Sequence, residues 1–162
     1  MSKAIMRRLF VMMLIGVSLG VHAADVPKAS SHLLIQGDTV YDKKSNLTWA
    51  RCSVGQQWED GVGCKGLVGI FTFDEAQKQA GGGWRVPTKS ELGTLIVAGK
   101  QKPTIDEVAF PNMDLEILLY WTSTPDGNLG GWHVHFEDGS IDGNGRSSAN
   151  AVRLVRDGMM QK

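Results

Sequence analysis

Long apolar runs are almost absent from this 162-residue chain. The longest covers residues 9–21, and a helix of that length, roughly 20 Å, is shorter than the hydrocarbon core of a bilayer. An excess of charge is absent as well, because 17 basic residues face 17 acidic ones. A protein that binds nucleic acid needs a basic face to replace the counterions of the phosphates. The composition therefore argues against a stable membrane span and against a nucleic-acid partner.

Cysteine is scarce, since Cys52 and Cys64 are the only two. A reactive or metal-binding pair is one interpretation, but no histidine stands near them to complete a zinc site. A disulfide is the other, and it would close a short loop that contains Gly61 and Gly63. We expect the Cys52–Cys64 disulfide, with a stabilisation of about 3 kcal/mol in the chain-entropy model.

Sequence signatures of catalysis are also missing. No Gly-Lys-Ser/Thr sequence marks a phosphate-binding loop, and the sequence identifies no histidine partner for any of its serines. The paired acids Asp74-Glu75 are explained as the start of a helix. We therefore expect no enzymatic activity, no cofactor and no metal ion.

The N-terminus has the pattern of an export signal. Three basic residues precede the apolar run, and Val21-His22-Ala23 supplies small residues at the spacing that signal peptidase recognises. We predict a signal peptide over residues 1–23, with an uncleaved anchor as the alternative. Removing it leaves 14 basic and 17 acidic residues. The mature chain is then slightly acidic and is expected in the periplasm or outside the cell.

The rest of the chain has the length of one domain. Residues 24–32 are small and polar, which predicts a flexible N-terminal segment, and the domain is expected over residues 33–158. Short strands separated by polar turns open it, with turns predicted at Gln36-Gly37-Asp38 and Lys43-Lys44-Ser45-Asn46. Two helices follow. Strands close the domain, with a turn predicted at Gly130-Gly131 and a last strand over residues 151–155. This order predicts an α+β fold.

The same capping pattern predicts the start of each of the two helices. Thr72 is followed three residues later by Glu75, and Thr88 by Glu91, so that each pair can form a capping box. We expect the first helix to reach about Ala80 and the second to end near Gly99.

Gly81-Gly82-Gly83 should stop the first helix, because glycine adopts a left-handed cap without steric cost. Trp84 is expected to bury its ring between the two helices, and Arg85 to pair with an acid or a carbonyl. This stretch is therefore predicted to shape the fold.

The segment from Lys100 to Glu116 is long and irregular, and loops of this kind are often functional. The alternative is a solvated loop that Ile105, Val108 and Phe110 hold against the core. Acidic and amide side chains in this loop and in the later turn are the candidate ligand-binding residues: Asp106, Glu107, Asp114, Glu116, Asp126 and Asn128.

Several short motifs follow one another in a specific order. They are Val40-Tyr41-Asp42, Leu47-Thr48-Trp49, Gly83-Trp84-Arg85-Val86-Pro87-Thr88, Tyr120-Trp121-Thr122-Ser123 and Val152-Arg153-Leu154-Val155-Arg156. Together they resemble the C-terminal domain of the Lcl collagen-like adhesin, a bacterial domain of the C-type-lectin-like superfamily. The Trp84 segment is also similar to one in formylglycine-generating enzymes. The resemblance implies a C-type-lectin-like fold with two helices flanking small antiparallel sheets and with the termini close together.

The resemblance does not extend to the functional residues of two groups within the superfamily, the formylglycine-generating enzymes and the calcium-dependent lectins. The formylglycine-generating enzymes use a catalytic cysteine pair late in their chain, whereas no cysteine follows Cys64 in this sequence. The calcium-dependent lectins use an acidic loop motif, whereas Phe110-Pro111-Asn112 lacks the acid. Neither oxidase chemistry nor calcium-mediated sugar binding is expected.

A last candidate is the alternating stretch that carries His133, His135 and Glu137. On a strand these side chains share one face and could bind zinc. The simpler interpretation, which we favour, is the polar outer face of an antiparallel strand whose apolar residues face the core.

The expected function is that of a non-catalytic, exported binding module for an envelope or surface polysaccharide or for a protein. The alternative is a periplasmic inhibitor or immunity protein that blocks a cell-wall hydrolase or a toxin, for which a small, disulfide-bonded, slightly acidic domain is suited.

Overall fold

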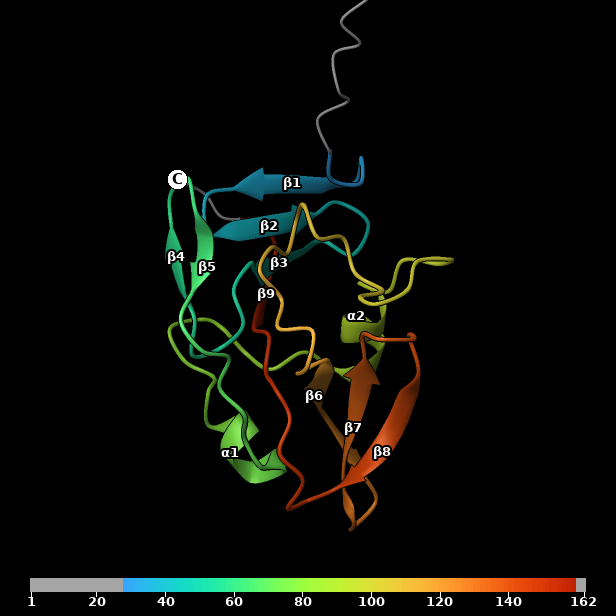
Figure 1. Cartoon of the computed structure of the whole chain (residues 1–162). Coiled ribbons are helices and arrows are strands. Elements are labelled where there is room, and N and C mark those ends of the chain that lie inside the picture. Colours follow the sequence, from blue (N-terminus) through green and yellow to red (C-terminus); the bar gives the residue numbers. More distant parts are fainter. Residues whose placement is uncertain (1–27, 160–162) are drawn as a thin grey trace, which may run out of the picture.

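The computed structural model describes residues 28–159, which form three small antiparallel sheets and two short helices (Figure 1). The predicted α+β class is confirmed at this level, with more strand than helix. The predicted signal peptide, residues 1–23, lies outside the described residues. Between residues 28 and 159, no helix has the length and apolar character needed to span a membrane.

A four-stranded sheet contains both the first and the last strand of the domain. Its order is β1-β2-β3-β9, and the strands are β1 (Leu33–Gln36), β2 (Thr39–Asp42), β3 (Leu47–Ala50) and β9 (Val155–Asp157). Each neighbouring pair is antiparallel. The polar turns expected around Gly37 and Asn46 connect the first three strands, and both residues have positive φ.

A hairpin that the sequence did not predict follows, with β4 (Gln57–Glu59) paired to β5 (Gly63–Lys65). The predicted disulfide is present: Cys52 and Cys64 are bonded, with 5.3 Å between their Cα atoms. The bond joins β5 to the segment that follows β3. The backbone N–H of Cys64 also donates to Oδ1 of Asn112, so the long loop rests on this hairpin.

The two helices begin where expected and end earlier. They are α1 (Phe73–Gln77) and α2 (Lys89–Gly93), so the predicted ends near Ala80 and Gly99 are wrong. After α2, Val97 donates its N–H to the carbonyl of Thr104. This hydrogen bond turns the chain into the long loop in place of another helical turn.

The three glycines after α1 form a tight turn and do not cap the helix. Gly81 and Trp84 exchange backbone hydrogen bonds across it, and Gly82 and Gly83 both have positive φ. The predicted burial of Trp84 between the helices is also wrong. Its ring is partly exposed, and the guanidinium of Arg156 lies 4.5 Å from the ring centroid.

The third sheet has the order β6-β7-β8, with β6 (Leu119–Asp126), β7 (Gly130–His135) and β8 (Ile141–Gly145). The turn predicted at Gly130 and Gly131 is wrong, because both residues lie in β7. Gly131 is needed there because a Cβ at this position would overlap the ring of Phe73 in α1. The last predicted strand begins later than expected, at Val155, while Ala151 forms an isolated parallel bridge with Tyr120.

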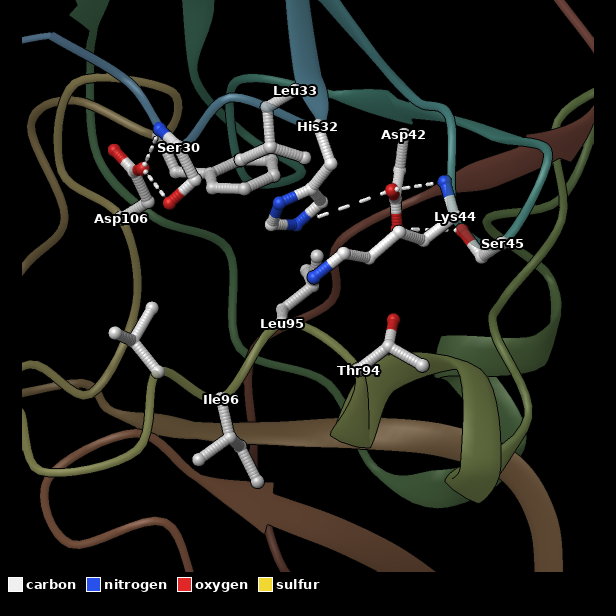
Figure 2. Close-up of a pocket in the computed structure, with 12 residues that line it drawn as sticks. Ser30, His32, Leu33, Asp42, Lys44, Ser45, Thr94, Leu95, Ile96 and Asp106 are labelled. Atoms are coloured by element: carbon white, nitrogen blue, oxygen red, sulfur yellow. Dashed lines mark hydrogen bonds and ion pairs between the residues drawn. The ribbon is translucent and has the colours of Figure 1, made fainter.

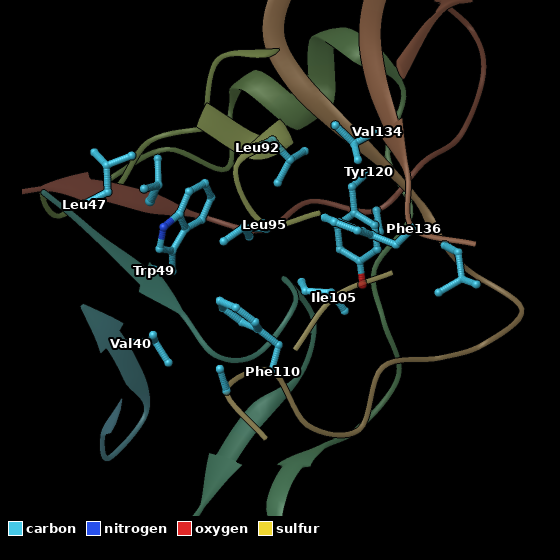
Figure 3. Packing of buried hydrophobic residues seen from close by; sticks show 14 of the residues in the cluster. Val40, Leu47, Trp49, Leu92, Leu95, Ile105, Phe110, Tyr120, Val134 and Phe136 are labelled. Carbon is cyan, nitrogen blue, oxygen red and sulfur yellow. The ribbon is translucent and has the colours of Figure 1, made fainter. Parts of the chain in front are cut away.

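The core lies between the sheets and α2 (Figure 3). Trp49 from β3 and Tyr120 from β6 are completely buried. The loop residues Ile105 and Phe110 are buried beside them, which confirms that the long loop is held against the core. A second cluster joins α1 to β6 through the edge-to-face contact of Phe73 and Trp121.

Candidate functional site

A half-enclosed hollow of about 410 Å³ lies between the β1–β2 hairpin, α2 and the long loop (Figure 2). We call it the Lys44 pocket. Its floor is apolar and consists of Leu33, Leu95, Ile96 and Phe110. Its rim is polar, with side chains from four separate segments: Ser30, His32, Asp42, Lys44, Ser45, Thr94 and Asp106.

The turn after β2 fixes one side of the rim. Asp42 is buried, and its carboxylate accepts hydrogen bonds from the backbone N–H of Lys44 at 2.9 Å and from the hydroxyl of Ser45 at 2.7 Å. These bonds hold the turn, because an Asp side chain commonly satisfies the backbone two residues later. Nε2 of His32 lies 4.0 Å from Asp42 Oδ1, which is beyond hydrogen-bonding distance.

The amine of Lys44 is the available cation of this site. Its side chain extends over the pocket toward Leu95 and Thr94 (Figure 2). Within residues 28–159 it forms no hydrogen bond or ion pair, whereas the neighbouring Lys43 amine donates to the carbonyl of Ser31 at 2.7 Å. Lys44 can therefore bind an anionic or carbonyl oxygen of a ligand without breaking an internal contact.

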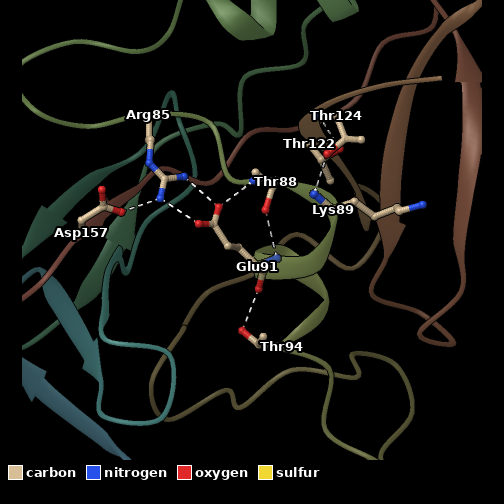
Figure 4. Close-up of polar contacts among 8 residues, drawn as sticks. All are labelled: Arg85, Thr88, Lys89, Glu91, Thr94, Thr122, Thr124 and Asp157. Atoms are coloured by element: carbon tan, nitrogen blue, oxygen red, sulfur yellow. Dashed lines mark hydrogen bonds and ion pairs between the residues drawn. The ribbon is translucent and has the colours of Figure 1, made fainter. Parts of the chain in front are cut away.

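The opposite side of the rim is set by the start of α2 (Figure 4). The capping box predicted at Thr88 is present: Thr88 Oγ1 accepts from the N–H of Glu91, and Glu91 accepts from the N–H of Thr88. Arg85 binds the same carboxylate through two hydrogen bonds of 2.7 and 2.8 Å and also binds Asp157. These contacts fix the direction of α2, and Thr94 follows at its C-terminal end.

The Glu91 carboxylate is held in its charged form. The hydrogen bonds from Arg85 lower the pKa of Glu91 more than burial raises it, and the bonds from Thr88 act in the same direction. Arg85, whose pKa the Glu91 contact raises, is paired with acids as the sequence predicted.

The third part of the rim joins the N-terminal segment to the long loop through Asp106. Its carboxylate accepts from the N–H and the hydroxyl of Ser30 at 2.7 and 2.8 Å, and from the N–H groups of Val108 and Ala109. Burial acts to raise the pKa of Asp106, but these hydrogen bonds outweigh it and hold the pKa below its usual value. Ser30 thus contacts the domain, although residues 24–32 were expected to be flexible.

The comparisons with known proteins identify the domain. A family model for the Lcl C-terminal domain matches residues 38–156. The chain belongs to this family. A search of curated proteins found no match.

The motifs that carry the resemblance to the Lcl C-terminal domain have structural positions here. Trp49, Tyr120 and Trp121 are completely buried, and Arg153 is 1% exposed. Arg85 holds the start of α2. These residues account for the fold of this Lcl C-terminal domain.

The six candidate ligand-binding residues do not form one site. Asp106 lies on the rim of the Lys44 pocket, and Glu107 follows it with an ion pair of 2.6 Å to Lys100. Glu116 lines a separate groove that also contains His135, and Asp114 accepts its N–H. The remaining two lie where β6 connects to β7: Asp126, the last residue of β6, whose backbone carbonyl accepts the N–H of Leu129, and Asn128, which is exposed.

The histidine face of β7 differs from the expected polar surface. His133 is 8% exposed and packs edge-to-face on Trp121, because α1 and its neighbours cover that side of the sheet. Burial lowers the pKa of His133. His135 lies 3.5 Å from Glu137 and 3.6 Å from Asp138. Over the part of the chain that the structure describes, no group of three or more metal-ligating side chains is assembled.

Sequence reasoning missed Lys44 and Thr94 as rim residues. Lys44 was assigned to a polar turn, and Thr94 to the interior of a longer helix. The only local signal is the run Lys43-Lys44-Ser45-Asn46. Nothing in that run indicates that the second lysine faces α2, about fifty residues later.

Proposed function

We propose that this Lcl C-terminal domain is an exported, non-catalytic binding module that holds one disaccharide repeat of an envelope or surface polysaccharide in the Lys44 pocket. The observation that carries the proposal is the combination of an apolar floor with a rim of hydroxyls and an unpaired amine. Ligand sites typically combine an apolar lining with a few convergent polar groups, in cavities of about 300–1,000 Å³.

An N-acetylated sugar has the chemistry that this pocket can recognise. The methyl of its acetamido group would contact Leu95 and Ile96, and its hydroxyls would donate to the oxygens of Ser45 and Thr94. A carboxylate on the sugar would bind the amine of Lys44. A glycan with N-acetyl and carboxylate groups therefore fits better than a plain glucose polymer.

The same pocket lacks the contacts that a catalytic pair would require. The imidazole of His32 does not reach the Asp42 carboxylate, which is engaged by the turn. A general base needs a partner that orients it and a proton within about 3 Å. Binding without chemistry is accordingly the role we assign to the pocket.

The cellular location and the finer fold class belong to the same proposal. The leader sequence and the Cys52–Cys64 disulfide support export to an oxidising compartment. The pairing of β3 with β9, together with two helices beside small sheets, supports the C-type-lectin-like architecture.

Calorimetric titration tests the proposal with two probes, the disaccharide GlcNAc–MurNAc and neutral chitobiose. We expect Lys44→Met to weaken the binding of GlcNAc–MurNAc, which carries a carboxylate, about tenfold, because a charged hydrogen bond contributes about 1.5–3 kcal/mol. The binding of chitobiose should weaken by less than twofold. Lys78→Met, at an exposed lysine outside the pocket lining, is the matched control and should bind both sugars normally. Equal loss by the two lysine variants would contradict the assignment.

The inhibitor hypothesis also has a specific observation in its favour. Leu67, Ile70 and Leu115 are 87%, 54% and 49% exposed, and the last two line the groove that contains Glu116. Apolar surface beside acids is typical of an interface with a basic protein. If a partner from envelope extract is retained by the wild type and lost with Ile70→Asp, while Lys44→Met retains it, the inhibitor function is favoured.

A further inference from the structure

A second hollow lies on the other side of the C-terminal end of α2. It has a volume of about 530 Å³ and is bounded by Lys89, Ser90, Gly93, Thr94, Trp132 and Ile141. We call it the Trp132 groove. Thr94 lines both this groove and the Lys44 pocket, so a chain-like ligand that leaves the pocket over Thr94 enters the groove directly.

Trp132 differs from the other residues on its side of β7. Val134 and Phe136 follow at every second position, so their side chains face the same side as that of Trp132. Both are completely buried, whereas Trp132 is partly exposed. Its partner across the β7–β8 pair is Gly143, which has no side chain of its own, and the carboxylate of Asp126 occupies the space beside that glycine. A large aromatic surface is therefore present where the fold does not bury it, and such surfaces are suited to binding.

The face of this indole is covered by a single amine. Nζ of Lys89 lies 3.5 Å from the ring centroid, and the side chain extends away from Arg85 and Glu91 toward β7 (Figure 4). The Lys89 backbone is fixed separately, through its N–H to Oγ1 of Thr124 at 2.9 Å. In the described part of the chain the amine has no carboxylate partner, so a ligand can displace it from the ring without breaking an ion pair.

We propose that the Trp132 groove is a second saccharide subsite, which binds the first sugar of the repeat that follows the disaccharide held in the Lys44 pocket. This inference rests on the proposed function. One apolar face of a pyranose ring would stack on Trp132, while the Lys89 amine and the Ser90 hydroxyl would bind its oxygens. Two subsites in series make affinity depend on the length of the glycan.

The experiment compares GlcNAc–MurNAc with its tetrasaccharide, which contains two repeats, by calorimetry. In the wild-type protein the tetrasaccharide should bind at least tenfold more tightly than the disaccharide. Trp132→Ala should abolish this gain and change the disaccharide affinity less than twofold. Trp132→Phe keeps an aromatic face and should retain most of the gain. Trp58→Ala is the control, because Trp58 also stacks on a cation, Arg51, but lies outside both sites.

A second readout is the indole N–H resonance of Trp132 in ¹⁵N-labelled protein. It should shift with the tetrasaccharide and not with the disaccharide. Equal affinity of the wild type for both probes, with no shift of this resonance, would overturn the second subsite and leave the Lys44 pocket intact. A length gain that Trp132→Ala removes, together with affinities for both probes that Lys44→Met leaves unchanged, would support the groove and contradict the proposed pocket. A tetrasaccharide that neither binds nor shifts the resonance would overturn both.

Discussion

Arg153 is the buried residue whose replacement tests the description of the core most sharply. It is 1% exposed, and its guanidinium donates to the carbonyls of Ala50, at 2.8 Å, and Arg51. A third bond reaches Oγ of Ser53 at 3.3 Å. Among residues 28–159 it has no carboxylate within ion-pair distance. The charge is instead compensated by carbonyl oxygens and by aromatic rings, with Phe110 at 4.8 Å.

The perturbation we choose is Arg153→Met, which keeps most of the volume and removes the charge. Each buried acceptor that loses its donor costs about 1–3 kcal/mol, and the lost cation–π contacts cost up to about 2 kcal/mol. Removal of the buried charge stabilises the folded state by about 1–4 kcal/mol and offsets part of this loss. We expect a net destabilisation of about 3 kcal/mol, which corresponds to a fall in Tm of roughly 10 °C.

Urea unfolding followed by tryptophan fluorescence provides the assay, with the disulfide intact. Arg146→Met is the control, because Arg146 forms a solvent-exposed ion pair with Asp74 at 2.9 Å and its loss should leave the urea midpoint close to that of the wild type. An Arg153→Met protein that unfolds at the urea concentration of the wild type would refute the assigned role of these hydrogen bonds.

Four further predictions concern separate features. Reduction of the disulfide, or the double change Cys52→Ser/Cys64→Ser, should lower the unfolding free energy by about 3 kcal/mol in the same assay. Thr88→Ala should cost about 1 kcal/mol in urea unfolding through loss of the cap of α2. Trp84→Ala should cost only about 1–2 kcal/mol, since its ring is partly exposed and gains a cation–π contact from one side; a loss above 4 kcal/mol would show that the ring belongs to the core. Burial lowers the pKa of His133 below its usual value of 6.5. As the pH falls, the imidazole therefore takes up a proton in the unfolded chain at a higher pH than in the folded protein. Its contribution to the free energy of unfolding is fully present above about pH 6.5 and declines below that pH. His133→Phe should flatten the change in urea midpoint between pH 7 and pH 5, and an unchanged slope would contradict this assignment.

Local chemistry accounts for the features that the sequence predicted correctly. The capping box at Thr88 involves residues three positions apart, and the pair Arg85 and Glu91 is six apart. The disulfide follows from the presence of only two cysteines. Such features depend on neighbours along the chain, so they can be recognised without knowledge of the tertiary structure.

The burial of individual aromatic residues could not be predicted in the same way. Trp84 and Trp121 occur in similarly short motifs, yet only Trp121 is enclosed. It is buried because α1 packs Phe73 against it and because Phe71 accepts its indole N–H at 2.7 Å. Trp84 is partly exposed beside a glycine turn, and the guanidinium of Arg156 lies 4.5 Å from its ring centroid. The difference is set by distant segments.

The same limit applies to the candidate site. The acidic residues of the long loop were predicted to bind a ligand because of their charge. The Asp106 carboxylate instead accepts hydrogen bonds from Ser30 and from its own loop. Lys44 and Thr94 come together only because β2, β3 and α2 converge. A site assembled from separate segments leaves no continuous pattern in the sequence.

The central claim is most directly tested by amide chemical-shift mapping of the ¹⁵N-labelled protein with GlcNAc–MurNAc. The account predicts that the largest shifts fall on Lys44, Ser45 and Thr94, with little change at Ile70 and Leu115. Saturable shifts confined to Ile70 and Leu115, or no saturable shift around Lys44 at millimolar disaccharide, would contradict the assignment of the Lys44 pocket as the binding site.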